Sequence, residues 1–437
     1  MISHKKVHQI IIKLILYSFI LSIFQNLKLQ AKISPLADKP DWSRLDPFQY
    51  SISKSKFLKL LNEVYAPHNA WSQSIRIFET HALILTGDKS WDNAYKLHYA
   101  TQAKTNALNS SALYWLQSSK QTAAPSIQTS LEPLPLNGRR IAIDPGHLGG
   151  SWAKMEERWF QIGKDTPVTE GDMTLRVALL IKEQLEQLGA TVLLTRQSTE
   201  PVTSKRPADF VNEARQQLIS WGISNPLKTF RSRFDPKRIY STDWRSQMFF
   251  YRISEIRARS KLINQKLKPE LALCLHFNAE SWGDPSKPTL VDKNHFHILI
   301  NGTYMAGELE FEDSRFEMMY KILSQVYDNE LKAAKVFRHH FVKETSLPPF
   351  IYHGKNATAL DSKKYIWSRN LIANRLFNCP TLFLEPYVMN SRDTYAHINA
   401  GEYVGTRSIL GRDRKNIYKE YADTVVKALI EYYRITP

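Results

Sequence analysis

The sequence predicts an α/β fold, in which a mostly parallel twisted sheet carries helices on both faces and follows a small α+β N-terminal domain. Two observations support this prediction. Beyond about residue 137, apolar runs of strand length alternate with longer segments of helical period. One such run, residues 271–277, is nearly all apolar, as expected of a strand buried on both faces. The length of 437 residues suits about two domains, and 43% hydrophobic with 23% charged residues is a globular composition.

The segments that follow residue 137 justify the sheet one by one. The first strand, from residue 140, runs into a turn at Pro145 and Gly146, and Thr169 with Asp172 resembles a capping box at the start of the next helix. Two regions interrupt the alternation and are interpreted as insertions, near residues 200–250 and 304–350. The remaining elements are expected in this order: a helix ending at Gly189, a strand over 191–195, a helix from 253 stopped by Pro269, strands over 271–277, 296–300 and 381–384, helices within 306–343 and a last helix over 414–434.

The residues before 137 divide into three parts. Residues 1–31 have the layout of a signal peptide: Lys5 and Lys6 precede an apolar run, and a small-residue cleavage site follows. That run is short for a membrane helix, so we expect export to the periplasm or cell envelope, with no stable membrane span apart from the signal segment. Residues 32–117 are expected to form an accessory domain of unknown role. Residues 118–136, rich in Ser, Thr, Pro and Gln, are interpreted as a linker.

Charge and cysteine content narrow the classes of partner. With 59 Lys and Arg against 42 Asp and Glu, the formal net charge is +17, which favours an anionic partner. The cations are scattered rather than gathered in one tract, which argues against nucleic acid and leaves anionic lipid or an anionic envelope polymer. Two cysteines without a CxxC motif exclude a disulfide scaffold and a cysteine zinc site. Whether Cys274 and Cys379 pair is left open.

Four side chains suited to metal binding or proton transfer are predicted at one edge of the sheet. His147 and His276 lie at the ends of two buried strands, Glu170 begins a helix, and Glu385 ends another strand. In a parallel sheet these strand ends and helix starts share one edge. Two imidazoles and one carboxylate leave the fourth position of a tetrahedral zinc ion open, which is the pattern of catalytic zinc sites. The second carboxylate could then act as a general base.

The motifs around these residues add a family resemblance. They read Asp-Pro-Gly-His-Leu-Gly-Gly at 144–150, Leu-Thr-Arg at 194–196, Cys-Leu-His-Phe-Asn-Ala at 274–279 and Cys-Pro-Thr-Leu-Phe-Leu-Glu at 379–385. In this order they resemble the catalytic domain of zinc-dependent N-acetylmuramoyl-L-alanine amidases (the amidase_3 type) over about residues 137–437. The resemblance implies an enzyme that hydrolyses the amide bond between N-acetylmuramic acid and L-alanine in peptidoglycan. It implies Zn²⁺ held by His147, Glu170 and His276, with Glu385 as the catalytic base that moves the proton of water to the leaving amine.

Several alternatives stay open at this point. His147 and Glu170 are 170 − 147 = 23 residues apart, so Glu156 and Glu157 are rival metal ligands, and Glu170 is preferred because it begins the amphipathic helix. The protein could instead be an inactive peptidoglycan-binding envelope protein, or a zinc peptidase or amidase acting on another cell-wall peptide. A monomer is expected, with peptidoglycan as substrate and with an activating or recruiting protein as a possible partner.

Other residues receive weaker interpretations. Asp144 either orients His147 or holds the turn, Asn278 either binds substrate or finishes a turn, and Cys274 is expected in the core. The segment 304–350 could act as an inhibitory plug. Five histidines have no matching constellation and are interpreted as structural: His295, His297, His339, His340 and His353. Three tryptophans are candidates for stacking on glycan: Trp152, Trp159 and Trp244.

Overall fold

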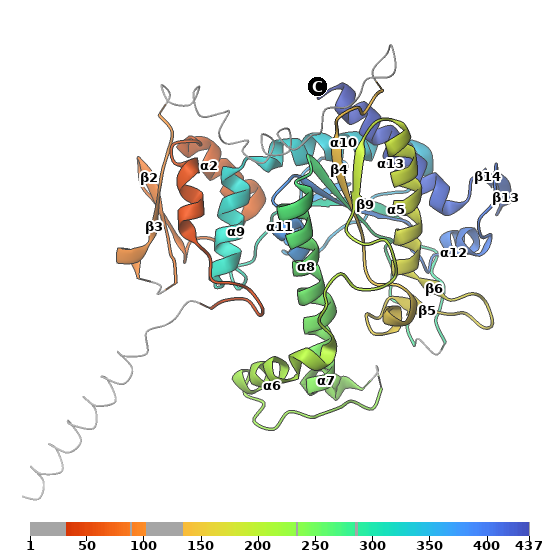
Figure 1. The fold of residues 1–437 in the computed structure, drawn as a ribbon, viewed down its shortest axis with the longest axis horizontal. Coiled ribbons are helices and arrows are strands. Elements are labelled where there is room, and N and C mark those ends of the chain that lie inside the picture. Colours follow the sequence, from red (N-terminus) through yellow and green to blue (C-terminus); the bar gives the residue numbers. More distant parts are fainter. Residues whose placement is uncertain (1–31, 88–89, 102–133, 233–234, 285–286, 437) are drawn as a thin grey trace, which may run out of the picture.

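The computed structural model describes residues 32–87, 90–101, 134–232, 235–284 and 287–436 (Figure 1). The predicted signal peptide lies outside these residues, as does the predicted linker apart from residues 134–136. Within the described part of the chain, none of the helices combines the length and apolar character needed to cross a membrane.

A central sheet of seven strands organises the molecule, in the order β10-β11-β9-β12-β8-β4-β7. Neighbouring strands are parallel from β12 through β8 and β4 to β7, whereas β9 runs antiparallel to β12 and β10 antiparallel to β11. The predicted mostly parallel α/β fold is therefore confirmed. The strand bounds are β4 Arg140–Pro145, β7 Thr191–Leu194, β8 Leu271–Leu275, β9 Phe296–Ile300, β10 Thr358–Ala359, β11 Ile366–Ser368 and β12 Thr381–Pro386.

Helices cover both faces of this sheet (Figure 1). One face packs on α5 (Glu170–Gln187), α10 (Val326–Thr345) and α13 (Ile417–Arg434). The other faces α8 (Glu255–Lys261) and α11 (Ile372–Leu376). Strand β8 shows why both layers are needed: Leu271 and Leu273 belong to the first core, while Ala272 and Cys274 belong to the second. Both cysteine thiols are free and buried.

The insertion near 200–250 is more regular than its sequence pattern indicated. It contains α6 (Val211–Ser220) and α7 (Thr242–Met248), with the short helical turns η5 (Pro207–Phe210) and η6 (Pro236–Tyr240). The chain continues through η7 (Phe249–Ser254), α8 and η8 (Leu262–Leu267), and ends its helical run at Lys268 in the left-handed region. Smaller elements near the sheet are η4 (Gly150–Lys154), β5 (Trp159–Phe160), β6 (Val168–Thr169), α12 (Arg392–Asn399), β13 (Arg407–Ile409) and β14 (Arg412–Arg414).

The N-terminal unit forms its own small sheet but shares its core with the second insertion. Its elements are η1 (Trp42–Phe48), α2 (Lys54–Leu60), η2 (Leu61–Tyr65), β1 (Ile75–Ile77), β2 (His81–Ile84), η3 (Trp91–Asn93) and β3 (Tyr95–His98). The side chains of Phe57 and Leu61 pack in one cluster with Met318 and Ile322 of α9 (Glu312–Leu323). Figure 1 places α9 beside α2, between the small sheet and the large one. The accessory unit is thus built together with part of the segment 304–350.

The packing of α9 and α10 tests the suggestion that the segment 304–350 acts as an inhibitory plug. Helix α9 belongs to the core of the N-terminal unit, and α10 packs against α13 and the main sheet. Neither helix contributes a residue to the hollows around His147 and Glu385, where only Phe350 of this segment is found. The idea that these helices block the site is therefore wrong.

Candidate active site

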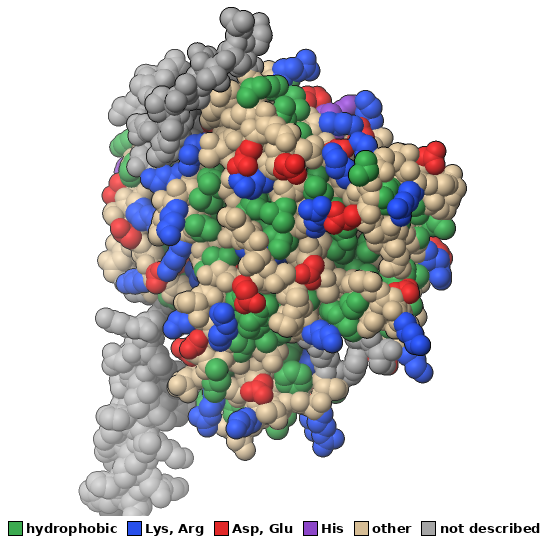
Figure 2. Space-filling model, turned by 45° about the vertical axis from the view of Figure 1, so that its right-hand side comes forward, with side chains coloured by type: hydrophobic (Ala, Val, Ile, Leu, Met, Phe, Trp, Pro, Cys, Tyr) green, Lys and Arg blue, Asp and Glu red, His purple; other side chains and the backbone are tan. Residues whose placement is uncertain are grey.

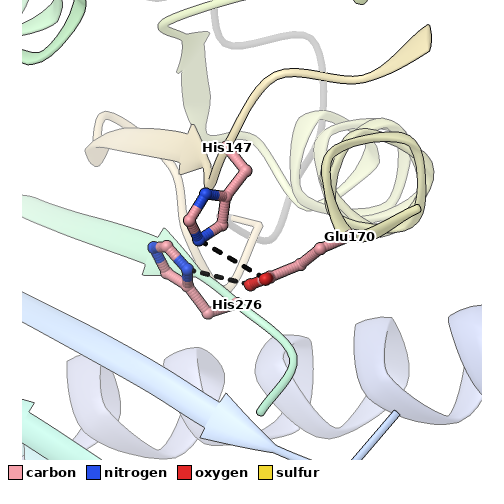
Figure 3. Close-up of side chains that lie close together, drawn as sticks. All are labelled: His147, Glu170 and His276. Atoms are coloured by element: carbon pink, nitrogen blue, oxygen red, sulfur yellow. Dashed lines mark hydrogen bonds and ion pairs between the residues drawn. The ribbon is translucent and has the colours of Figure 1, made fainter. Parts of the chain in front are cut away.

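The three predicted metal ligands converge at the carboxyl edge of the sheet (Figure 3). One ligand atom from each of His147, Glu170 and His276 lies within 4.8 Å of the others. Nε2 of His147 is 3.4 Å from Oε2 of Glu170, and Nδ1 of His276 is 3.1 Å from Oε1 of the same carboxylate. Tetrahedral zinc with bonds of about 2.0–2.1 Å would separate its ligand atoms by roughly 3.3 Å. The donor types and spacings therefore fit a metal ion.

His147 owes its position to the turn after β4. Its backbone has φ 57°, in the left-handed region, and the preceding Gly146 donates its N–H to the Leu275 carbonyl at 2.8 Å. A Cβ atom on Gly146 would lie 2.4 Å from the His276 ring. Only glycine lets the two ligand-bearing strand ends approach this closely.

Glu170 is the first residue of α5, where the helix meets the same turn. A Cβ on Gly171 would fall 2.1 Å from the Leu148 carbonyl oxygen, so this glycine permits direct contact of two backbones. The predicted capping box is wrong. Thr169 makes no side-chain capping bond, and Asp172 instead accepts from the Gly150 N–H, at 3.1 and 3.0 Å from its two carboxylate oxygens.

Glu156 holds the ring of His147, the first proposed ligand. Its Oε2 lies 3.0 Å from Nδ1 of His147 and accepts from the Leu148 N–H at 2.9 Å, with only 3% of the side chain exposed. A histidine that donates Nδ1–H to a carboxylate keeps Nε2 free for a metal. Glu157 points elsewhere and lies 3.8 Å from Arg238. The geometry thus favours Glu170 as the third ligand. Glu156 instead orients the ring of His147.

Arg158 contacts the ligand set and was missed by the sequence reasoning. Its Nε lies 3.2 Å from both Nε2 of His147 and Oε2 of Glu170. Because a guanidinium repels a metal cation, Arg158 in this position would oppose metal binding. The only sequence signal was its place in the long run between His147 and Glu170.

Asp144 holds the turn and does not orient the ring of His147. Its Oδ1 accepts from the Thr195 hydroxyl at 2.5 Å and from Nη1 of Arg259 at 3.1 Å. Arg259, which is also paired with Glu255, donates further to the Pro145 carbonyl at 2.8 Å and the His147 carbonyl at 3.2 Å. These contacts fix the backbone that carries the first ligand.

Burial and neighbouring charges set the protonation of the ligands. Burial lowers the pKa of His147 well below its ordinary value, and the nearby Arg158 adds to this, so the ring is neutral. Burial alone would raise the pKa of Glu170, but the adjacent imidazoles and Arg158 outweigh it and lower that pKa. For His276, burial lowers the pKa, but the charges of Glu385 and Glu170 outweigh it and raise that pKa. Neutral imidazole and carboxylate are the forms that bind metal, so His276 would give up its proton on binding.

Glu385 lies at the end of β12 and lines two hollows of 260 and 380 Å³. Both hollows are also lined by His147, Arg158, His276 and Arg369, so they meet at the ligand set. Burial raises the pKa of Glu385 to about 7, and the charge of Glu170 adds to this, whereas His276 opposes it. A carboxylate of that basicity can exchange protons near neutral pH.

The structure also brings His297 into the site, although we predicted a structural role for it. Because β9 runs antiparallel to β12, its beginning lies at the carboxyl edge, and His297 pairs in register with Glu385. Its ring contacts the Tyr352 hydroxyl at 3.0 Å and Asn278 at 3.4 Å. The signal in the sequence was one histidine at the start of an apolar strand, but its meaning depended on the strand direction.

The other weak candidates lie away from the ligand set. Cys274 sits in the core between the sheet and α8, and is not among the residues grouped as a metal site. Asn278 accepts from the Ala279 N–H at 2.7 Å, as a turn-finishing residue does, and it also lines the smaller hollow. None of the three tryptophans proposed for stacking lines either hollow: Trp152, Trp159 and Trp244.

Part of the chain is similar to a known protein family. Residues 141–220 match the Amidase_3 family model, described as N-acetylmuramoyl-L-alanine amidase, which confirms the predicted resemblance. The germination-specific N-acetylmuramoyl-L-alanine amidase of Bacillus subtilis (strain 168) is 28% identical over 146 residues, which are 32% of this chain and 56% of that relative. The chain thus spans about half the length of this curated relative.

Solved amidase structures also overlap with the chain. The apo form of the N-acetylmuramyl-L-alanine amidase Ami1 from Mycobacterium abscessus aligns with a TM-score of 0.36 and 16% identity, covering 68% of this chain and 100% of that one. The N-acetylmuramoyl-L-alanine amidase AmiC2 of Nostoc punctiforme aligns with a TM-score of 0.35 and 13% identity, covering 69% and 98%.

Proposed function

We propose that this chain, which matches the N-acetylmuramoyl-L-alanine amidase family model over residues 141–220, hydrolyses the amide bond between N-acetylmuramic acid and L-alanine in peptidoglycan. His147, Glu170 and His276 hold Zn²⁺, and Glu385 is the catalytic base. One observation carries the proposal: Glu385 lines the same cleft as the three proposed ligands. Both hollows are lined by Glu385, His147 and His276, and the smaller hollow is also lined by Glu170.

The residues of the chain divide the work. Bound Zn²⁺ would polarise the amide carbonyl and make water acidic enough to attack near neutral pH. Glu385 accepts the proton of the attacking water and delivers it to the nitrogen of the leaving amine, a contribution of about 10²–10⁴-fold in rate. Burial supports this role, because it raises the pKa of Glu385 to about 7. Arg158, which lines both hollows, would have to leave its place between His147 and Glu170 for the ion to bind.

We also propose that the protein acts outside the cytoplasm, in the periplasm or cell envelope. The motifs of the predicted signal peptide and the formal net charge of +17 support this, because the cell wall is an anionic polymer. On the face in Figure 2, the Lys and Arg side chains of the described residues are dispersed among acidic and apolar ones. A monomeric state and an activating partner remain predictions.

Release of stem peptide from purified muropeptides tests the proposal. We expect wild-type protein to release it, a chelator to stop the release, and added Zn²⁺ to restore it. Glu385→Gln should retain metal and lose about 10²-fold or more of kcat, while Glu402→Gln, at an exposed ion pair with Arg176, should behave as wild type. If zinc-loaded wild type and Glu385→Gln were equally inert, the protein would be a binding protein. Equal cleavage of a stem peptide without muramic acid would indicate a peptidase.

A further inference from the structure

The cleft wall beyond the proposed metal ligands carries a cation, Arg369, that forms no ion pair with any described residue. Arg369 lines both hollows. Among the residues that the structure describes, no carboxylate lies within ion-pairing distance of its guanidinium, and its one side-chain hydrogen bond goes to a neutral hydroxyl. Arg259, by contrast, is already paired with Asp144 and Glu255. The charge of Arg369 is therefore available to a bound anion.

This guanidinium is held in one orientation. Nη1 donates to the Tyr352 hydroxyl at 3.2 Å, and the guanidinium carbon lies 5.3 Å from the centre of the same ring. The backbone N–H of Arg369 donates to the Ile300 carbonyl at 3.0 Å. The Tyr352 hydroxyl is in turn fixed by His297 at 3.0 Å. Because Nη1 is the only side-chain donor used within the described chain, the other N–H groups remain free for a ligand.

The surroundings indicate what kind of ligand fits. A guanidinium with free N–H groups recognises a carboxylate through two parallel hydrogen bonds. The larger hollow adds apolar side chains, including Leu299, Leu371 and Phe383, and the exposed Arg252. A peptide chain that carries a free carboxylate matches this mixture of apolar wall and unpaired cation.

The position of the carboxylate follows from chain geometry. Arg369 and Glu385 line the same two hollows, so a group held by Arg369 lies close to the bond that Glu385 serves. An extended peptide advances about 3.3–3.6 Å per residue. We propose that Arg369, positioned by Tyr352, determines specificity by binding a free carboxylate that the stem peptide carries near the cleaved bond. This inference rests on the proposed amidase function.

Two synthetic muramoyl peptides test the inference. They are identical except that the second residue carries either a free α-carboxylate or a primary carboxamide. We expect wild-type protein to favour the carboxylate by about 10- to 100-fold in kcat/KM, mainly through KM. Arg369→Gln should bring this ratio close to one. Arg369→Lys keeps the charge but cannot form two parallel hydrogen bonds, so it should give an intermediate ratio. Tyr352→Phe removes only the orienting hydroxyl and should also give an intermediate ratio.

The controls separate this inference from misfolding and from failure of the proposed function. Arg407→Gln, on the hairpin of β13 and β14, should keep the wild-type ratio. Each variant should bind metal in the wild-type amount, and if Arg369→Gln does not fold, the ratios of Arg369→Lys and Tyr352→Phe decide. Cleavage of both peptides at equal kcat/KM by wild type, or an unchanged ratio in the Arg369 and Tyr352 variants, would overturn the inference while leaving the amidase proposal intact. If wild type cleaved neither peptide, the proposed function would fall and the inference with it.

Discussion

Glu156 offers the sharpest test of how the first ligand is oriented. Replacing it with alanine removes the acceptor 3.0 Å from Nδ1 of His147 but removes no proposed ligand. Loss of such an orienting carboxylate typically costs 10- to 100-fold in metal affinity, so we expect Glu156→Ala to raise the zinc Kd by about that factor. The same change leaves the buried Leu148 N–H, now bonded at 2.9 Å, without a partner. That should lower the free energy of unfolding by about 1–3 kcal/mol.

The assay is a zinc competition titration against a chromophoric chelator, run with two comparison variants. Glu157→Gln is the matched control, because the Glu157 side chain is 41% exposed and pairs with Arg238 at 3.8 Å. It should bind zinc as wild type does. Glu170→Ala removes a ligand and should weaken binding more than Glu156→Ala. The reasoning is refuted if Glu156→Ala binds zinc like wild type, or if it abolishes binding while Glu170→Ala has no effect.

Three further predictions follow from the site and the core. Arg158→Gln removes a cation 3.2 Å from two ligand atoms and should tighten zinc binding by about tenfold or more in the same titration; unchanged affinity would show that Arg158 does not compete with metal. Gly171→Ala would place a Cβ 2.1 Å from the Leu148 carbonyl oxygen, so it should lower the thermal midpoint and weaken zinc binding together, and a neutral effect on both would contradict the close backbone contact. Burial raises the pKa of Glu330 to about 7 from 4.5, against the opposing charge of Lys321 at 3.7 Å. The folded chain then holds this proton more tightly than the unfolded chain, so the free energy of unfolding should fall by about 3 kcal/mol between pH 4.5 and 7, and denaturant titrations of Glu330→Gln should lack that decline.

The sequence predicted that the three proposed metal ligands lie together, because each follows or begins an element with a strong pattern. His147 and His276 end buried strands, and Glu170 opens an amphipathic helix, so a parallel arrangement was enough to bring them together. The same argument predicted Glu385 at this edge of the sheet. In the structure, Glu385 lines the same cleft as His147, Glu170 and His276. The patterns of single strands and helices were therefore enough to predict the positions of these four residues.

The rest of the site depended on information that single elements do not contain. His297 reaches the site only because β9 runs antiparallel to β12, and strand direction is set by the sheet as a whole. Arg369 follows β11, a three-residue strand too short to show a period, and its side chain is placed by Tyr352 from a segment without regular structure. The joint core of the N-terminal unit and α9 likewise arises from contacts distant in sequence.

The central claim is that His147, Glu170 and His276 together bind one metal ion. Metal analysis of the purified chain, beside His147→Ala and His276→Ala, tests it most directly. We predict one equivalent of zinc in the wild-type protein and its loss from both variants, with folding confirmed by thermal unfolding of the metal-free forms. A full equivalent retained by both variants would contradict the claim, as would a wild-type chain that takes up no metal when zinc is supplied.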